Sequence, residues 1–221
     1  MVVSDVEGSA PVIGERLSLD LMNTSYSTRG KPAEGLGSPE QATSWVQRIA
    51  GRLADAGATS ASEARFGEAG LDDLLALRTA MRSLADAVVS GGTPGAHDVE
   101  RINRAAALTP RWSSMAWNGD ARPAMTKQSA GAPADQVLST LAGDAVDLFT
   151  GADAARLRMC ERPGCDLFFL KDHPRREWCT PACGARVRAA RSYQKRVQRA
   201  RSASAIGASQ PSPTTPERRR R

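Results

Sequence analysis

Four cysteines fall within 24 residues of this chain and stand in two close pairs. The first pair is Cys160 and Cys165, and the second is Cys179 and Cys183. Two short loops that each carry two thiolates suit one tetrahedral Zn²⁺ ion. The alternatives are two disulfides or four free thiols, and the paired spacing in a chain without a recognisable secretory leader argues against disulfides. The sequence therefore predicts one structural zinc ion with these four cysteines as its ligands.

The segment between the two pairs is typical of a β-hairpin. Pro163 and Gly164 favour a tight turn inside the first pair. Residues 167–170 are good strand formers, and we expect them to pair with residues 177–178. His173 lies near the predicted bend and is an alternative ligand, or the base of a nuclease-type site. Because four thiolates leave zinc no open position for water, the pattern favours a structural ion over hydrolytic chemistry.

A basic helix is predicted to follow the second pair. Thr180 favours an N-cap and Pro181 the first helical position, which places Cys183 in the first turn. At about 100° per residue, an apolar side from Cys183 to Val197 lies opposite a cationic side, although Arg186 projects toward the apolar side. We expect the cations to bind phosphates and base edges of double-stranded DNA, and the alternative is a solvated helix without a ligand. The predicted contacts are Arg186, Arg188, Arg191, Lys195, Arg196 and Arg199.

The charge is divided unevenly along the chain. Residues 156–221 hold 17 Lys and Arg against 5 Asp and Glu, a net charge of +12, whereas residues 1–155 hold 13 against 19, a net charge of −6. This contrast indicates two modules with different partners, the basic one suited to a polyanion. The last residues are rich in Ser, Ala, Pro and Thr and end in four arginines, a composition typical of disorder. No apolar window is long enough to span a membrane, so we expect a cytoplasmic protein without a membrane partner.

The acidic module is predicted to be mostly helical. Helices are expected from Ser38, a capping residue followed by Pro39, and over residues 71–88, 99–108 and 137–149, where apolar residues recur at helical spacing. Residues 17–21 alternate and favour a short strand, with a helix start as the alternative, and residues 23–37 are typical of a loop. Residues 112–117 and 121–126 flank Asn118-Gly119, a hairpin turn signal. The predicted fold is mainly α with small β elements.

The acidic module shows no motif for catalysis. It contains no glycine-rich phosphate loop and no nucleophile elbow. Asp20 and Asn23 are two polar residues beside an apolar segment, and they either line a ligand pocket or cap their own backbone. We therefore do not expect an enzyme, and an enzyme with its pocket in this module is the competing interpretation.

These residues resemble a known pair of domains. The segment from Cys160 to Arg196 resembles the CGNR zinc finger through its Cys-x4-Cys spacing, HPRREWC at residues 173–179 and CGAR at residues 183–186. The upstream part resembles the ABATE domain through LSLDLMNT at residues 17–24. The resemblance covers about residues 13–200 and implies a bacterial transcription regulator that binds zinc and DNA. It assigns zinc to the four cysteines, whereas the Asn of the family signature is Ala185 here, which puts DNA specificity in question.

The sequence thus predicts a DNA-binding regulator in three parts. An ABATE-like helical domain spans residues 13–155 and senses a small effector or self-associates. A treble-clef-like finger with four cysteines, a β-hairpin and a basic helix spans residues 156–201, and a basic tail spans residues 202–221. A single finger buries little surface, so we expect a homodimer. The alternatives are a zinc-stabilised protein-interaction module and an RNA-binding protein.

Overall fold

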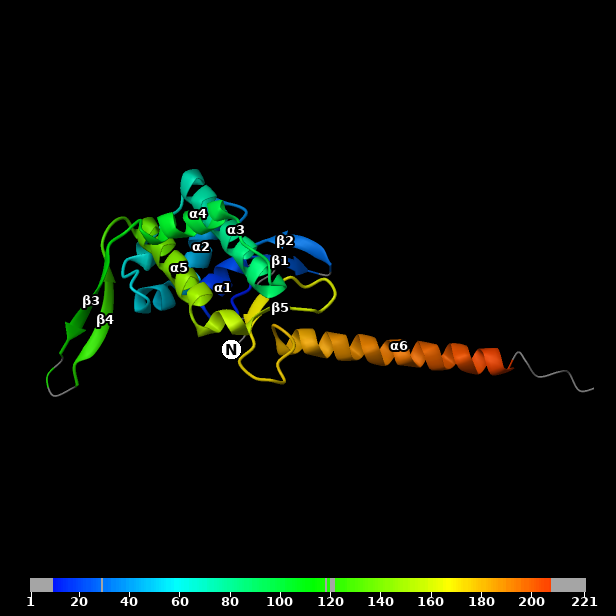
Figure 1. Cartoon of the computed structure of the whole chain (residues 1–221). Coiled ribbons are helices and arrows are strands. Elements are labelled where there is room, and N and C mark those ends of the chain that lie inside the picture. The colour runs from blue at the N-terminus through cyan, green and yellow to red at the C-terminus, as the bar shows by residue number, and fades with distance from the viewer. Residues whose placement is uncertain (1–9, 29, 118, 120–121, 208–221) are drawn as a thin grey trace, which may run out of the picture. The chain divides into compact units, whose positions relative to one another are not determined.

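The computed structural model describes residues 10–28, 30–117, 119 and 122–207, and it is mostly helical (Figure 1). The helices are α1 (Leu17–Met22), α2 (Pro39–Asp55), α3 (Glu68–Ser90), α4 (Ala96–Ala106), α5 (Pro133–Thr150) and α6 (Pro181–Gly207), with short 3₁₀ turns η1 (Ala61–Glu63) and η2 (Ala152–Arg156). The strands form antiparallel pairs, β1 (Ser25–Thr28) with β2 (Lys31–Glu34), β3 (Arg111–Ala116) with β4 (Ala124–Ser129), and β5 (Leu157–Met159) with β6 (Phe168–Leu170). The predicted fold class, mainly α with small β elements, is confirmed.

The chain forms two compact units, and each is described by itself. The first is Met1–Thr180 and the second is Pro181–Arg221. Residues 156–180 lie in the first of these units, and the finger of residues 156–201 stays a prediction of domain boundaries. Helix α6 continues to Gly207, six residues into the tail predicted from composition, and residues 208–221 lie outside the described residues.

Helix α2 begins as its sequence predicts. The Ser38 hydroxyl accepts a hydrogen bond from the Gln41 amide at 3.3 Å, and the Gln41 side chain accepts one from the Gly37 amide at 2.7 Å. The first contact satisfies an amide that the first turn leaves without an intrahelical partner, and Pro39 lacks such an amide. The second contact joins the residue before the cap to the first turn. The apolar residues of α2 that face the core are Ala42, Trp45, Val46, Ile49 and Leu53.

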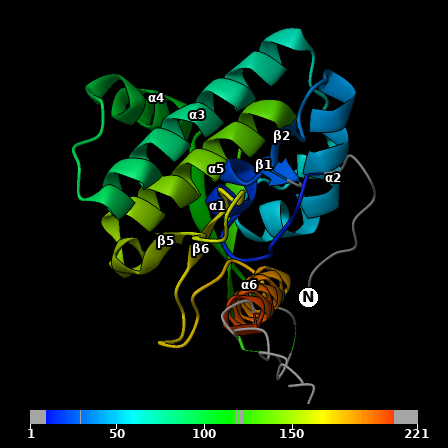
Figure 2. The ribbon, with the colours of Figure 1, turned by 90° about the vertical axis from the view of Figure 1, so that its right-hand side faces the viewer.

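Helices α3 and α5 lie side by side in the helical unit (Figure 2). Helix α5 also contacts α1, α2 and α4, and its buried positions lie on several sides, including the consecutive Val137, Leu138 and Ser139. Helix α3 ends where predicted, because Gly91 adopts a left-handed conformation with φ of 72° that suits glycine. Within the part of the chain that the structure describes, no helix is long and apolar enough to cross a membrane.

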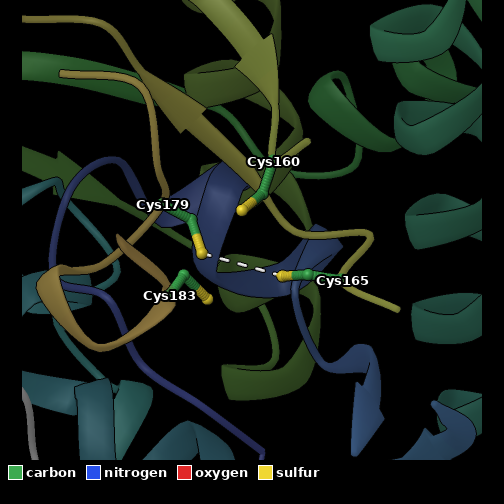
Figure 3. A group of neighbouring side chains, drawn as sticks. All are labelled: Cys160, Cys165, Cys179 and Cys183. Atoms are coloured by element: carbon green, nitrogen blue, oxygen red, sulfur yellow. Dashed lines mark hydrogen bonds between the residues drawn. The ribbon is translucent and has the colours of Figure 1, made fainter. Parts of the chain in front are cut away.

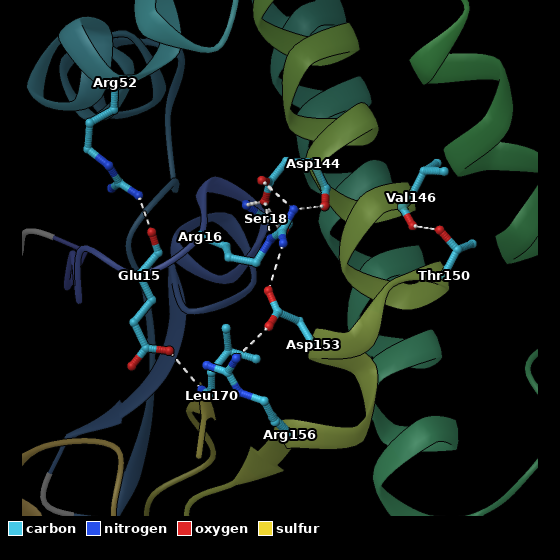
Figure 4. Close-up of polar contacts among 10 residues, drawn as sticks. All are labelled: Glu15, Arg16, Ser18, Arg52, Asp144, Val146, Thr150, Asp153, Arg156 and Leu170. Atoms are coloured by element: carbon cyan, nitrogen blue, oxygen red, sulfur yellow. Dashed lines mark hydrogen bonds and ion pairs between the residues drawn. The ribbon is translucent and has the colours of Figure 1, made fainter. Parts of the chain in front are cut away.

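Residues 17–21 form helix α1 and not the favoured strand. Alternation of apolar and polar types normally marks one buried and one exposed face. Here the polar Ser18 and Asp20 are as buried as their apolar neighbours. Ser18 bonds Asp144, and Arg16 pairs with Asp144 and Asp153, which fixes the start of α1 against α5 and η2 (Figure 4).

Two hairpins differ in how well the sequence predicted them. The predicted loop of residues 23–37 contains the β1–β2 hairpin, in which Tyr26 is paired with Ala33. The β3–β4 hairpin exists as predicted and extends away from the helices (Figure 1). Its second strand begins at Ala124, which is paired with Ala116, and not at residue 121 as the sequence predicted. Its predicted turn at residues 118–119 is described only at Gly119, because residue 118 lies outside the described residues.

Candidate metal centre and basic helix

The first cysteine pair lies in the loop between β5 and β6. Cys160 follows β5 directly, and its amide donates to the Leu167 carbonyl at 2.9 Å, which extends the pairing of the two strands. Strand β6 therefore pairs with the upstream β5, and the predicted pairing of residues 167–170 with residues 177–178 is wrong. The register joins Leu157 to Leu170 and Met159 to Phe168.

A tight turn brings the first two cysteines together. The Cys165 amide donates to the Arg162 carbonyl at 2.9 Å, and Gly164 has a φ of 72°. A Cβ atom on Gly164 would lie 3.2 Å from the Cα atom of Gly30, in the turn between β1 and β2. Both the conformation and the close approach favour glycine at this position.

The second pair spans the start of α6. Cys179 is buried, and Pro181 begins the helix as predicted, so that Cys183 lies in its first turn. The four sulfur atoms lie within 4.8 Å of one another, and those of Cys165 and Cys179 are 3.8 Å apart (Figure 3). None of the four cysteines forms a disulfide, and this distance far exceeds a disulfide bond of about 2.05 Å.

The sulfur positions fit a zinc ion. Tetrahedral zinc with Zn–S bonds of about 2.3 Å requires neighbouring sulfurs roughly 3.8 Å apart, the separation of Cys165 and Cys179. The group is largely buried, with Cys160, Cys179 and Cys183 nearly inaccessible and Cys165 partly exposed. The four cysteines therefore form one potential structural zinc site.

The thiols influence one another strongly at this separation. Hydrogen bonds from the side chains of Cys165 and Cys179 lower the pKa of Cys160 to about 3. The neighbouring Cys160 and Cys165 side chains raise the pKa of Cys179 far above that of an ordinary thiol. A divalent cation held by the four sulfurs would remove the mutual repulsion of several thiolates.

His173 takes a local role in the loop between β6 and α6. Its Nδ1 atom accepts a hydrogen bond from the Arg175 amide at 3.1 Å, and its carbonyl accepts one from the Arg176 amide at 2.9 Å. Its side chain is exposed, and the group of possible metal ligands consists of the cysteines alone among the described residues. These contacts give the alternative ligand or nuclease role no support.

The predicted nucleic-acid contacts lie on α6. Residues 181–207 contain seven Lys and Arg and no Asp or Glu. Val187 and Val197 are half-buried, whereas Tyr193, predicted on the apolar side, is 61% exposed and has the Arg196 guanidinium 5.8 Å from its ring centre. The six predicted cations are all exposed, namely Arg186, Arg188, Arg191, Lys195, Arg196 and Arg199.

Asp20 and Asn23 are fully buried and bind other parts of the helical unit. Asp20 pairs with Arg52 and accepts hydrogen bonds from the amides of Ile13 and Gly14, while burial raises the pKa of its carboxyl group. The Asn23 amide bonds the backbone of Phe168. Their polar atoms therefore have protein partners, which supports a structural role and not a ligand pocket.

The sequence pattern missed three residues that contact the cysteine-bearing segment, namely Glu15, Arg82 and Arg176. Arg176 pairs with Glu15, donates to the Cys179 carbonyl at 2.9 Å and places its guanidinium 4.9 Å from the ring centre of Phe169. Arg82 donates to the Asp166 carbonyl at 3.2 Å. Arg176 belongs to the HPRREWC motif, but no local signal in the sequence marks Glu15 or Arg82.

Two segments of the chain match models of known protein families. Residues 15–152 match the ABATE model, described as "putative stress-induced transcription regulator", and residues 156–196 match the CGNR zinc finger. The chain belongs to the ABATE family. The recognition made from the sequence is therefore confirmed for both domains, and the zinc finger match agrees with the cluster of four cysteines. The chain matches no curated protein. The two models indicate a regulatory zinc-finger protein.

Proposed function

We propose that this ABATE–CGNR protein is a cytoplasmic, zinc-dependent regulator that binds double-stranded DNA through α6. Cys160, Cys165, Cys179 and Cys183 would bind one Zn²⁺ ion, which would fix the loop between β5 and β6 to the start of α6. Four protein ligands would leave the ion no open position for catalysis. The exposed cations of α6 would then contact phosphates. The observation that carries the proposal is that α6 combines exposed cations with the complete absence of acidic residues.

The charge of α6 suits a polyanion better than an ordinary solvated face. Solvated helices usually mix both signs, because opposite charges three or four residues apart stabilise the helix. Helix α6 contains no acidic residue that could form such a pair, so its positive charges repel one another unless anions bind to them. Phosphates supply these counter-charges, and arginines can also bind guanine edges in the major groove. Arg186, Arg188 and Arg191 are our candidates for base contacts because they lie nearest the metal centre along the chain.

The test is selection from a random duplex DNA library with the zinc-loaded full-length protein at two salt concentrations. Enriched sites that disappear after chelation are expected, and a palindromic site would indicate a dimer. A structured RNA of equal length serves as competitor, and its preferential binding would favour the RNA-binding alternative. Absence of salt-sensitive binding to either would overturn the proposal in favour of a protein-interaction module. The full-length chain is needed, because a truncation at residue 155 would remove Leu157, Phe168 and Leu170 from the core.

The second part of the proposal is that the helical unit supplies the regulatory input by self-association or by binding a small effector. The β3–β4 hairpin supports self-association, because Trp112, Met115, Trp117 and Met125 are between 49% and 75% exposed on it. The test is light scattering over a range of concentrations with the wild type and with Met115→Ser/Met125→Ser. A dimer that weakens in this variant is expected, and a monomer at all concentrations would contradict this route.

An effector site has a less specific basis. A cleft of about 470 Å³ is lined by Ser25, Arg78, Thr79, Arg82, Ser83 and Asp86. Arg78 already pairs with Glu34, and Arg82 donates to the carbonyls of Met22 and Asp166. Both arginines of the cleft thus already bind protein groups, which makes the cleft a weaker basis for an anionic effector. The exposed hairpin residues are the stronger basis for a regulatory input, by self-association.

A further inference from the structure

Strand β6 has two edges, and side chains of the helical elements satisfy the edge that faces away from β5. Alternate residues of a strand direct their backbone groups to opposite edges. Phe168 and Leu170 direct theirs away from β5, where unpaired buried groups would cost free energy. The Asn23 side chain donates to the Phe168 carbonyl and accepts from the Phe168 amide, both at 2.9 Å. One fully buried amide side chain thus substitutes for a neighbouring strand.

Glu15 extends this contact to the second cysteine pair. One oxygen of its carboxylate accepts from the Leu170 amide at 2.7 Å (Figure 4). The other oxygen pairs with Arg176. Arg176 in turn donates to the Cys179 carbonyl at 2.9 Å. The Glu15 carbonyl accepts from Arg52 of α2 at 2.8 Å. A continuous series of polar contacts therefore joins α2 to the backbone of a cysteine in the metal centre.

Arg82 of α3 makes a separate contact on the side of the first pair. Its guanidinium donates to the carbonyls of Met22 and Asp166, at 2.9 and 3.2 Å, and lies 5.1 Å from the ring centre of Phe168. Asp166 directly follows Cys165. The rings and side chains of this segment are also part of the main core, which includes Leu157, Phe168 and Leu170.

We propose that Glu15, Asn23 and Arg82 are positioning residues of the zinc site, and that zinc binding is thermodynamically coupled to the folding of the helical unit. These residues hold the backbone that carries Cys160, Cys165 and Cys179, although none of them is a candidate ligand. Coupling is reciprocal, so zinc stabilises helices that never touch it, and removing the contacts between those helices and the cysteine-bearing segment lowers zinc affinity. This inference extends beyond the proposed function, because it holds whether or not α6 binds DNA.

The experiment compares Asn23→Ala with Ser139→Ala in the full-length protein. Ser139 is a matched control, because it is fully buried and its hydroxyl donates one hydrogen bond, to the Ala106 carbonyl at 2.9 Å, away from the cysteines. Two quantities are measured for each protein: the zinc dissociation constant by chelator competition, and the rise in Tm that saturating zinc produces. A structural role alone lowers Tm equally with and without zinc, whereas positioning changes the rise itself.

We expect Asn23→Ala to weaken zinc binding by up to about tenfold, the lower end of the effect of removing a group that bonds a ligand directly, and to reduce the zinc-dependent rise in Tm. Ser139→Ala is expected to lower Tm while leaving zinc affinity within about twofold, since it removes no contact to the loop. Identical zinc affinity in wild type and Asn23→Ala would overturn the proposal. A wild-type protein that binds no zinc would overturn the zinc assignment as well, a failure distinct from a loss of DNA binding.

A milder variant covers the case in which Asn23→Ala does not fold. Glu15→Gln keeps an acceptor for the Leu170 amide but removes the charge that pairs with Arg176. We expect a smaller loss of zinc affinity than for Glu15→Ala, and this graded order is the signature of positioning. Equal affinities for Glu15→Gln, Glu15→Ala and the wild type would contradict the role of Glu15.

Discussion

Helices α5 and α6 are both long, but their sequences serve opposite purposes. Helix α5 has ten buried residues out of 18 and contacts four other helices. In α6, only Cys183 and Gly184 are buried among residues 181–202. The packing of buried side chains therefore characterises α5. The cysteine cluster at its start and its exposed cations characterise α6. Mutations in the two helices should accordingly separate stability from binding.

The largest effect is expected from α5. Leu141 is fully buried, and Leu141→Ala should lower the free energy of unfolding by about 2–5 kcal/mol, because it removes apolar contacts and leaves a cavity. Tyr193→Ala in α6 is the matched change of an exposed residue and should stay within about 0.5 kcal/mol. Urea unfolding measures both variants. Similar losses in the two helices would contradict the contrast between them.

The next effect concerns DNA affinity and is expected from α6. Arg188→Gln/Arg191→Gln/Lys195→Gln should weaken binding and reduce the slope of log affinity against log salt by about 2.7, since each phosphate contact contributes roughly 0.9. The urea midpoint should change little, because all three side chains are exposed. Fluorescence anisotropy with labelled duplex DNA at several salt concentrations measures the slope.

A control with the same charge change distinguishes local contact from net charge. Lys31→Gln/Arg65→Gln/Arg104→Gln removes three exposed cations from the helical unit. It lowers the net charge equally but leaves α6 intact, so the salt slope should stay close to that of the wild type. An equal loss in both triple variants would show that DNA responds only to the overall charge.

The contrast between the two helices also explains which features the sequence could predict. Helix α5 follows from its apolar spacing, α2 from the Ser38 cap, and the start of α6 from Pro181, because each signal is local. The four cysteines were identified because their types and spacing carry the chemistry of zinc. The fold class and the metal centre could therefore be predicted without a structure.

The features that the sequence did not reveal depend on contacts between distant residues. Strand β6 pairs with residues 157–159 and not with residues 177–178, and Asn23 and Glu15 occupy its other edge from more than 140 positions away. Asp20 resembled a pocket residue because its partner, Arg52, lies on another helix. Long-range pairing has no local signal, so hydrophobic period and turn composition alone leave the position of the zinc loop undetermined.

The smallest effect is expected from Ala185, the position at which this chain departs from the family signature. Ala185 is exposed on α6, so Ala185→Asn should cost at most about 0.7 kcal/mol, the difference in helix propensity, and should leave zinc affinity unchanged. The salt slope should also be unchanged, because no charge is altered. An exposed amide can bind adenine edges, so the change should appear in which DNA sites are enriched and not in how salt affects them. A rise in zinc affinity would instead show that the signature Asn braces the metal centre, and α6 would then share the structural character of α5 at its first turn.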